Sequence, residues 1–252
     1  MRMKDKVVLI TGGGKGIGRG IAEAFAEEGA NLVITGRELA ALNKAKDELE
    51  AQYKVNVLAV NGDGGNETDV KNVIQSTINT YGKLDVLVNN AMASKSGTML
   101  ADHTKEDFDL AIYSGLYATF FYMREAYPYL KETKGSVINF ASGAGLAGRI
   151  GQASYAAAKE GIRGMSRVAA TEWGPDGINV NVVCPLVETP QMLKWKETYP
   201  DQYEKTIQGI PLQRFGDAKN DVGRTCIFLA SEDASFMSGE TIVLQGGSGL
   251  RP

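Results

Sequence analysis

Residues 7–18 read VVLITGGGKGIG, and this stretch decides the fold. The apolar, β-branched run Val7–Thr11 predicts a buried strand, and the residues after Ile17 follow the spacing of an amphipathic helix. Glycines fill the turn between the two elements. A glycine-rich turn between a strand and a helix directs backbone N–H groups and a helix N-terminus toward one point. The stretch therefore predicts a strand–turn–helix unit that binds an anion.

The same alternation of short apolar runs and longer amphipathic stretches continues along the chain. It predicts strands at 7–11, 31–35, 55–60, 84–89, 136–141, 178–184 and 240–244, and helices at 17–28, 39–52, 70–81, 108–131 and 155–173. Several strands are apolar at every position, which is typical of parallel strands covered on both faces. The pattern predicts an α/β fold: a single domain, residues 1–252, with a doubly wound Rossmann-type parallel sheet and helices on both faces.

The composition excludes several other classes of protein. Among 252 residues, 30 are glycine and 7 are proline, without the G-x-y repeat of collagen. The net charge is −3 and no long run has one sign, which argues against a nucleic-acid partner. Cys184 and Cys226 form no CxxC, and the only histidine, His103, lies in a polar stretch. We therefore expect no disulfide framework, no metal site and no Ser-His-Asp or Cys-His catalysis.

Two further stretches bear on cellular location and on how a site is covered. The apolar run near the N-terminus is too short for a signal peptide or a membrane span, so we expect a soluble cytoplasmic protein without a membrane partner. Residues 187–215 form the longest stretch without a predicted strand and are rich in apolar and aromatic side chains. They predict helices that cover a site, with ordinary core packing as an equal alternative.

The spacing of the first glycines is G-x-x-x-G-x-G rather than the more common G-x-G-x-x-G. Because the turn joins the first strand of a doubly wound sheet to the first helix, it still predicts a site where a dinucleotide pyrophosphate meets bare backbone. The predicted cofactor-binding residues of this turn are Gly12, Gly14, Lys15, Gly16, Ile17 and Gly18.

The end of the second strand indicates which dinucleotide binds. An acidic residue there binds the ribose 2′-hydroxyl of NAD, whereas a basic residue suits the 2′-phosphate of NADP. Arg37 follows the strand and Lys15 adds a second cation, so the sequence favours NADP(H). Glu38 argues for NAD, and a solvated loop residue is the alternative for Lys15. Asp63 is predicted to bind the adenine amino group, with a turn aspartate as the alternative.

Three residues form the predicted catalytic set. Tyr155 and Lys159 are four residues apart in a predicted helix and therefore share one face. A cation beside a phenol lowers the pKa of the tyrosine from about 10 toward the working range. Such a tyrosine can donate a proton to a carbonyl or take one from an alcohol. Ser142, after the fifth strand, can bind the same substrate oxygen.

Taken together, these motifs resemble the short-chain dehydrogenase/reductase family over essentially the whole chain. TGGGKGIG resembles the family's cofactor turn, the segment 89–91 its NNAG motif, and Ser142, Tyr155 and Lys159 its catalytic residues. The resemblance implies hydride transfer between NAD(P) and an alcohol or carbonyl, usually in a homotetramer. The further cofactor contacts that it implies come from Asn90, Tyr155, Lys159, Glu188 and Thr189.

The sequence departs from the family pattern at three positions. Met92 replaces the glycine of NNAG, Leu186 replaces a glycine before Thr189, and Gly115 aligns with the family's active-site asparagine. A glycine inside a helix costs about 1 kcal/mol relative to alanine. We therefore interpret Gly115 as making room for another group.

Several runs, among them INFASGAGLAG, SRVAATEWG and QGGSGLRP, resemble the bacterial NADP-dependent 12α-hydroxysteroid dehydrogenases that act on bile acids. Glycines near the site would leave volume for a bulky steroid, namely Gly115, Gly143, Gly145 and Gly148. The expected function is hydride transfer between NADP(H) and a secondary alcohol or ketone of such a small molecule. The alternatives are a 3-oxoacyl-carrier-protein reductase, a general carbonyl reductase and a non-catalytic NADP-binding sensor.

Overall fold

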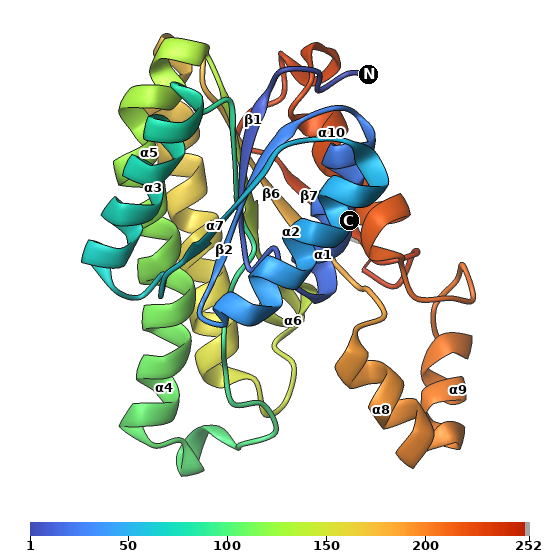
Figure 1. Ribbon diagram of the computed structural model, residues 1–252. Helices are drawn as coiled ribbons and strands as arrows, with labels where there is room; N and C mark the ends of the chain where they lie inside the picture. Colours follow the sequence, from blue (N-terminus) through green and yellow to red (C-terminus); the bar gives the residue numbers. More distant parts are fainter. Residues whose placement is uncertain (250–252) are drawn as a thin grey trace.

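The computed structural model describes residues 1–249, except for the side chains at positions 190 and 191. Its centre is a seven-stranded parallel sheet with the order β3-β2-β1-β4-β5-β6-β7 (Figure 1). The strands are β1 (Val7–Thr11), β2 (Asn31–Gly36), β3 (Val57–Asn61), β4 (Val86–Asn89), β5 (Ser136–Phe140), β6 (Asn179–Pro185) and β7 (Thr241–Leu244). The predicted parallel α/β sheet is confirmed.

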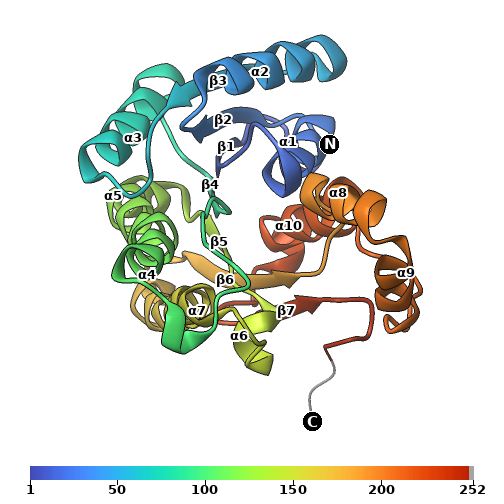
Figure 2. The same ribbon diagram turned by 90° about the horizontal axis from the view of Figure 1, so that it is seen from below.

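Helices cover both faces of the sheet (Figure 2). One layer contains α1 (Gly16–Glu27), α2 (Leu39–Tyr53) and α10 (Arg224–Leu229), and the other contains α3 (Glu67–Tyr81), α5 (Ala118–Thr133) and α7 (Ala153–Trp173). Because successive strand residues face opposite sides, Val8 and Ile10 of β1 pack in the first layer, and Val7 and Leu9 pack in the second. This arrangement explains why the strands are apolar at every position.

The helix predicted at 108–131 consists of three pieces. It begins earlier, as α4 (Lys105–Ala111), where Thr104 Oγ1 accepts a hydrogen bond from Asp107 N at 3.1 Å. A π-helical turn, η2 (Ile112–Tyr117), follows and contains Gly115, and α5 completes the run. A π-helical turn within an α-helix often marks a functional site.

Several short elements were not predicted from the sequence. The helix α6 (Gly143–Ala147) follows β5, and a second π-helical turn, η4 (Ala218–Gly223), leads into α10. The 3₁₀ turns are η1 (Leu100–Asp102), η3 (Gly174–Asp176) and η5 (Glu232–Ala234). Within the described part of the chain, no helix has both the length and the apolar character needed to cross a membrane.

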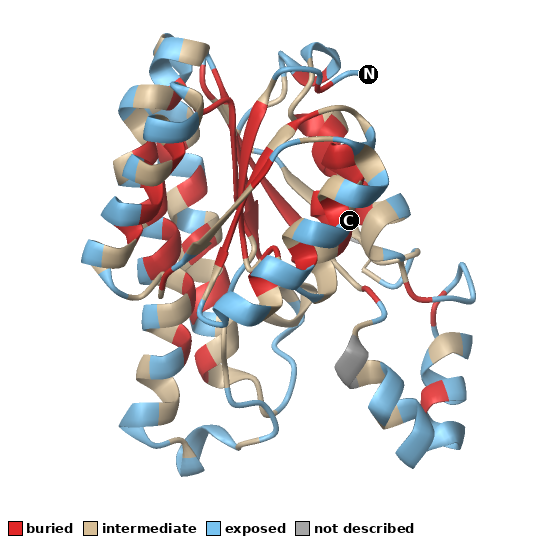
Figure 3. Cartoon of the chain, viewed as in Figure 1, coloured by how far each residue is buried: buried red, intermediate tan, exposed pale blue. Residues whose placement is uncertain are grey.

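Two helices, α8 (Pro190–Thr198) and α9 (Pro200–Gln208), extend away from the sheet (Figures 1 and 2). We call residues 187–216 the α8–α9 arm. Most of its surface is exposed (Figure 3), and its apolar side chains form a separate cluster around Tyr203, Ile210 and Phe215. The predicted helices are therefore present, but their aromatic residues pack on one another and not on the sheet.

Candidate active site

A cavity of about 620 Å³ opens at the carboxyl ends of the strands. It lies around β1 and β4, which are neighbours in the sheet although β2 and β3 come between them in the sequence. Ligands of open α/β sheets bind at such a reversal of strand order. The predicted cofactor residues that line the cavity are Gly12, Gly14, Lys15, Gly16, Ile17, Arg37, Asp63, Asn90 and Thr189.

The glycine-rich turn is shaped by close backbone packing. Gly12 has a φ of +70°, and its N–H donates to Thr35 O at 2.8 Å. A Cβ on Gly18 would lie 2.3 Å from Gly12 O and 2.7 Å from Asn90 Nδ2, so any side chain there would push the turn away from β4. Gly18 therefore packs behind the turn, and it is not among the described residues that line the cavity.

The turn also presents N–H groups to the cavity. Helix α1 begins at Gly16, with Lys15 at the N-cap, and no described side chain caps the first N–H groups of this helix. These groups and the helix dipole favour a negative charge at this end of α1. Together with the bare backbone at Gly12, Gly14 and Gly16, they fit the pyrophosphate of a dinucleotide.

Asn90 ties the turn to the end of β4. Its Nδ2 donates to Thr11 O at 2.9 Å, and its backbone N–H donates to Thr11 Oγ1 at 3.0 Å. The preceding residue, Asn89, begins a buried chain of side-chain hydrogen bonds. Asn89 Nδ2 donates to Asn139 Oδ1 at 2.9 Å, and Asn139 Nδ2 donates to Ser166 Oγ at 2.8 Å. This chain links β4 through β5 to α7, and neither Asn139 nor Ser166 was predicted from the sequence.

The corner predicted to hold a 2′-phosphate contains one ion pair. Lys15 Nζ lies 3.1 Å from Glu38 Oε1, and both side chains are exposed. Among the described residues, the Arg37 guanidinium has no such acidic partner, and Arg37 also lines the cavity. Glu38 thus offsets the charge of Lys15, which leaves Arg37 as the cation at this corner.

Asp63 has contacts consistent with both predicted alternatives. Its Oδ1 accepts a hydrogen bond from Gly65 N at 2.9 Å, which is the contact of a turn aspartate. The same residue lines the cavity beyond the end of β3. The turn contact fixes the carboxylate at the edge of the cavity.

The three predicted catalytic residues meet where β5, α6 and α7 converge. Ser142 is the N-cap of α6, and its Oγ accepts from Ala144 N at 3.1 Å. Lys159 is buried, and its Nζ donates to Phe140 O at 2.6 Å. The same Nζ lies 5.7 Å from the centroid of the Tyr155 ring. A phenol, a hydroxyl and an ammonium therefore lie close together.

The pKa of Tyr155 is shifted in the direction opposite to the expectation. Burial raises the pKa of Tyr155, and its hydrogen bond with Ser142 opposes this only in part. Burial also lowers the pKa of Lys159 to about 8, since a buried ammonium loses hydration. The net shift of the Tyr155 pKa is therefore upward, because the cost of burying the phenolate is the largest effect, and the lowering of this pKa by Lys159 stays a prediction.

Glu188 and Thr189 lie at the start of the α8–α9 arm. Thr189 is the N-cap of α8, where its Oγ1 accepts from Met192 N at 3.3 Å, and it lines the cavity. Glu188 is exposed and accepts a hydrogen bond from the Tyr203 hydroxyl of α9. The Glu188 carboxylate therefore holds the arm together, and its predicted role toward the cofactor stays a prediction.

Other side chains occupy the space next to most of the glycines that were expected to leave room for a steroid. A Cβ on Gly115 would lie 3.0 Å from Met92 Sδ, one on Gly143 would lie 1.9 Å from Gln245 Nε2, and one on Gly145 would lie 2.8 Å from Glu160 Oε1. Only Gly148 has nothing within 4 Å of such a Cβ. The expectation of open volume is wrong for the first three, because side chains from other elements fill the space.

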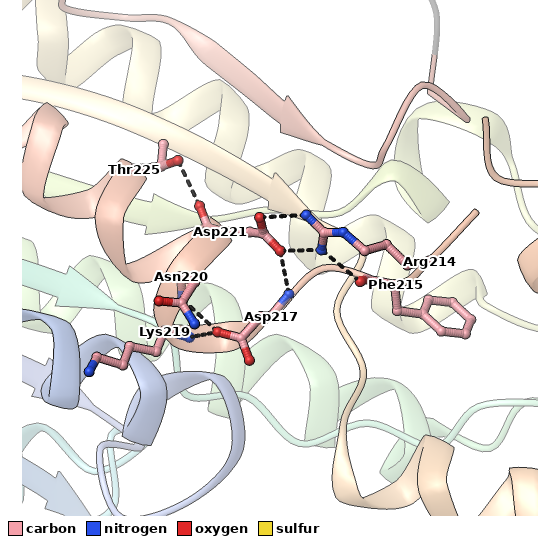
Figure 4. Close-up of polar contacts among 7 residues, drawn as sticks. All are labelled: Arg214, Phe215, Asp217, Lys219, Asn220, Asp221 and Thr225. Atoms are coloured by element: carbon pink, nitrogen blue, oxygen red, sulfur yellow. Dashed lines mark hydrogen bonds and ion pairs between the residues drawn. The ribbon is translucent and has the colours of Figure 1, made fainter. Parts of the chain in front are cut away.

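The base of the α8–α9 arm is anchored to the sheet domain by charged groups (Figure 4). Arg214 forms two hydrogen bonds with Asp221, of which the Nη2–Oδ1 contact is 2.9 Å, and Asp217 N donates to Asp221 Oδ2 at 2.6 Å. The guanidinium holds the pKa of Asp221 below its ordinary value. Since Lys219 Nζ also lies 3.0 Å from Glu27 Oε1 of α1, the base of the arm is connected to the helix that follows the glycine-rich turn.

Two backbone contacts close the same base. Glu188 N donates to Gly216 O at 3.1 Å, and Gly216 N donates to Leu186 O at 2.9 Å. The two ends of the arm therefore lie side by side. Neither this closure nor the Arg214 anchor was predicted, because the partners are distant in sequence or lie in a segment without a periodic signal.

The fold and this arrangement of residues define an oxidoreductase of the short-chain dehydrogenase/reductase family, to which the chain belongs. A family model described as enoyl-(acyl carrier protein) reductase matches residues 12–248.

Similar proteins of known activity agree with the class. The chain is 61% identical to a 12α-hydroxysteroid dehydrogenase of a Clostridium species, over 98% of both chains. It is 35% identical to a 3-oxoacyl-[acyl-carrier-protein] reductase of Thermotoga maritima, over 98% of this chain and 99% of that one. The crystal structure of levodione reductase superposes with a TM-score of 0.91 at 31% identity, covering 98% of this chain and 99% of that one.

Proposed function

We propose that this chain transfers a hydride between NADP(H) and the 12α-hydroxyl or 12-oxo group of a bile acid. The observation that carries the proposal is the 61% identity, over 98% of both chains, to a 12α-hydroxysteroid dehydrogenase. The convergence of Ser142, Tyr155 and Lys159 supports a carbonyl–alcohol reaction. The whole chain, residues 1–252, acts in this proposal as one cofactor-binding domain, and a cytoplasmic location stays a prediction from the sequence.

The bound nicotinamide would supply the hydride acceptor or donor. Gly12, Gly14, Gly16 and the N–H groups of α1 would hold the pyrophosphate, with Gly18 packed behind them and Ile17 at the cavity wall. Arg37 would bind the 2′-phosphate, and Lys15 would join it when its ion pair with Glu38 opens. The remaining proposed contacts come from Asp63, Asn90, Tyr155, Lys159, Glu188 and Thr189.

Tyr155 moves the proton. A pKa above the ordinary value keeps the phenol protonated near neutral pH, which is the form that donates to a carbonyl oxygen during reduction. Oxidation needs the phenolate, and the Lys159 ammonium is the nearby protein group whose charge stabilises it. Ser142 donates a hydrogen bond to the same substrate oxygen and holds it against the phenol.

A panel of bile acids that differ at one hydroxyl tests the substrate. We expect NADP⁺ reduction only with members that carry a 12α-hydroxyl, and kcat/KM for the others lower by at least about a hundredfold, because a hydroxyl that cannot reach Tyr155 cannot transfer its proton. Equal turnover of 3- or 7-hydroxylated members that lack the 12α-hydroxyl would contradict the substrate proposal and leave the family assignment intact.

The cofactor proposal is tested at Arg37. We expect Arg37→Ala to weaken NADP⁺ binding by about 10- to 100-fold, the value of a charge-assisted hydrogen bond, and to leave NAD⁺ binding unchanged. Glu38→Ala is the matched control, and it should strengthen NADP⁺ binding because it frees Lys15. A preference for NAD⁺ in the unaltered protein would contradict the proposal.

A second candidate is reduction of a 3-oxoacyl group on acyl carrier protein. It is supported by the 35% identity to the Thermotoga maritima reductase. A 3-oxoacyl thioester in the same assay separates the two candidates. If its kcat/KM exceeds that of every bile acid, the second candidate replaces the first.

We also propose that the protein assembles as a homotetramer. A groove between α5 and α7 is lined by apolar side chains that include Phe120, Met165 and Val168, and Val168 is 55% exposed. Large exposed apolar patches mark association sites. Val168→Glu should shift the mass measured by light scattering to a smaller species, and Leu193→Glu on α8 serves as the control.

A further inference from the structure

Two of the departures from the family pattern are in contact. Met92 lies in the segment that follows β4, and Gly115 lies in η2. A Cβ on Gly115 would lie 3.0 Å from Met92 Sδ and 3.2 Å from Met92 Cε and Cγ. These separations are tighter than ordinary van der Waals contact, so the Met92 side chain rests on the bare backbone of Gly115. A larger residue at position 115 would displace it.

The segment that carries Met92 is held in place from the same helical turn. Ala93 N donates to Ser114 Oγ at 3.0 Å, and Ser114 Oγ lies 2.9 Å from Ala93 O. The N–H of Ala93 is therefore satisfied by a side chain beside Gly115, and the single hydroxyl hydrogen of Ser114 is shared between Ala93 O and Leu110 O, which lies 2.5 Å from Ser114 Oγ. Ser114 fixes the position of the loop, and with it the position of Met92.

The η2 turn under Met92 also packs against α7, the helix that carries Tyr155 and Lys159. A Cβ on Gly161 of α7 would lie 2.9 Å from Leu116 Cδ2 of η2. Gly161 is two residues beyond Lys159 on the same helix. The turn on which Met92 rests is therefore in direct contact with the helix that positions Tyr155 and Lys159.

Met92 lies in the wall of the cavity that the proposed cofactor residues also line. Met92, Ala93 and Ser114 all line it, together with Asn90 and Thr189. A thioether side chain is apolar, unbranched and polarizable, so it fits against flat or irregular apolar groups. An asparagine at position 115 would present an amide to this region instead.

We propose that Met92 is a specificity-determining residue, whose side chain rests on Gly115 and forms an apolar wall for the steroid ring system. Gly115 makes room for Met92 and not for the substrate. This inference rests on the proposed bile-acid activity. In this proposal the Met92 thioether contacts an apolar polycyclic substrate.

A double-mutant cycle tests how Met92 is seated. Gly115→Asn should lower the melting temperature because Met92 is displaced, and adding Met92→Ala should recover at least half of the loss, since residues in contact are energetically coupled. If the two changes are additive, the seating is overturned. Should Gly115→Asn fail to fold, Gly115→Ala with and without Met92→Ala provides the same cycle with a smaller displacement.

The wall is tested by comparing two substrates. We expect Met92→Ala to raise KM for a 12α-hydroxylated bile acid about tenfold, while kcat/KM for cyclohexanol stays within about threefold, because only the large substrate loses the contact. Met237→Ala, which removes a partly buried methionine that packs on the α1 side of the sheet, should change neither value.

The outcomes distinguish this inference from the proposed function. An unaltered protein that turns over no bile acid contradicts the proposed function, and the steroid wall falls with it. An unaltered protein that oxidises a bile acid, with an unchanged bile-acid KM in Met92→Ala, contradicts the inference alone. A parallel loss on both substrates also overturns it, because that pattern indicates a general structural role.

Discussion

The glycine-rich turn and the α8–α9 arm border the same cavity but are built differently. The turn is held by backbone contacts, such as Gly12 N to Thr35 O, and lies against the buried strands. The arm is mostly exposed and has its own small apolar cluster around Tyr203 (Figure 3). It is connected to the rest of the molecule mainly at its base, where Arg214 contacts Asp221 (Figure 4).

The difference follows from what each region recognises in the proposed function. A pyrophosphate is the same in every dinucleotide, so a rigid backbone site is sufficient for it. A bulky substrate must enter past side chains, and segments with few buried apolar contacts open at low free energy. We therefore expect changes in the turn to act on cofactor binding and overall stability, and changes in the arm beyond Thr189 to act on the substrate alone.

The largest effect is expected at Tyr155, the proposed proton donor. Tyr155→Phe removes the proton donor and should lower kcat by about a thousandfold, the scale of general acid–base catalysis, with at most a few-fold loss of NADP⁺ affinity from the missing hydroxyl contact. Tyr199→Phe, at the exposed end of α8, is the control and should keep full activity. Retained biological function without turnover in Tyr155→Phe would instead identify a cofactor sensor.

Adding a single methyl group at Gly18 should destabilise the turn. Gly18→Ala places a Cβ 2.3 Å from Gly12 O, so we expect a loss of about 1–3 kcal/mol in the free energy of unfolding, together with weakened NADP⁺ binding. Gly164→Ala in α7 is the matched control, since its Cβ meets nothing within 4 Å and should add about 0.5–1 kcal/mol. If Gly18→Ala and Gly164→Ala change the free energy of unfolding equally in chemical denaturation, the turn is not sterically fixed.

Lys159 should give the protein a pH-dependent stability. Its pKa is about 8 in the folded protein, below the ordinary 10.5 of the unfolded chain, so the unfolded state binds the extra proton between these values. Stability from this group is therefore present at high pH and is lost as the pH falls through about 8. Between pH 8 and 10, the unaltered protein should gain about 2 kcal/mol relative to Lys159→Met. Parallel pH profiles of the two proteins in urea denaturation would contradict this.

The smallest effect is expected at the base of the arm. Asp221→Asn weakens the contact with Arg214, a partly exposed pair worth about 1 kcal/mol or less. Hydrogen exchange in residues 187–216 should become faster, and the bile-acid KM should rise a few-fold, with NADP⁺ affinity unchanged. Asp201→Asn, on the exposed surface of α9, is the control. Weakened NADP⁺ binding in Asp221→Asn would show that the two regions are not independent.

The parts of the molecule that were predictable depend on local rules. The apolar run Val7–Thr11 and the glycines after it specify a strand, a turn and a helix within a short stretch, and the spacing of Tyr155 and Lys159 specifies one face of a helix. Most of the cofactor positions predicted in this way line the cavity, and the three catalytic residues converge at the end of β5, although their roles stay predictions.

The parts that were missed depend on contacts between distant residues. The seat of Met92 on Gly115 joins two residues from different elements, and each departure viewed alone indicated only a missing side chain. The link from Asn139 to Ser166 crosses from a strand to a helix. The raised pKa of Tyr155 also depends on burial, which the spacing of two residues does not report.

The central claim is oxidation at carbon 12 of a bile acid by this cofactor–tyrosine arrangement. The most direct test is to incubate the protein and NADP⁺ with a bile acid hydroxylated at carbons 3, 7 and 12, and to identify the product by mass spectrometry and NMR. We predict a product two hydrogens lighter, with a ketone at carbon 12 and intact hydroxyls at carbons 3 and 7. A ketone at carbon 3 or 7, or unchanged substrate, would contradict the account.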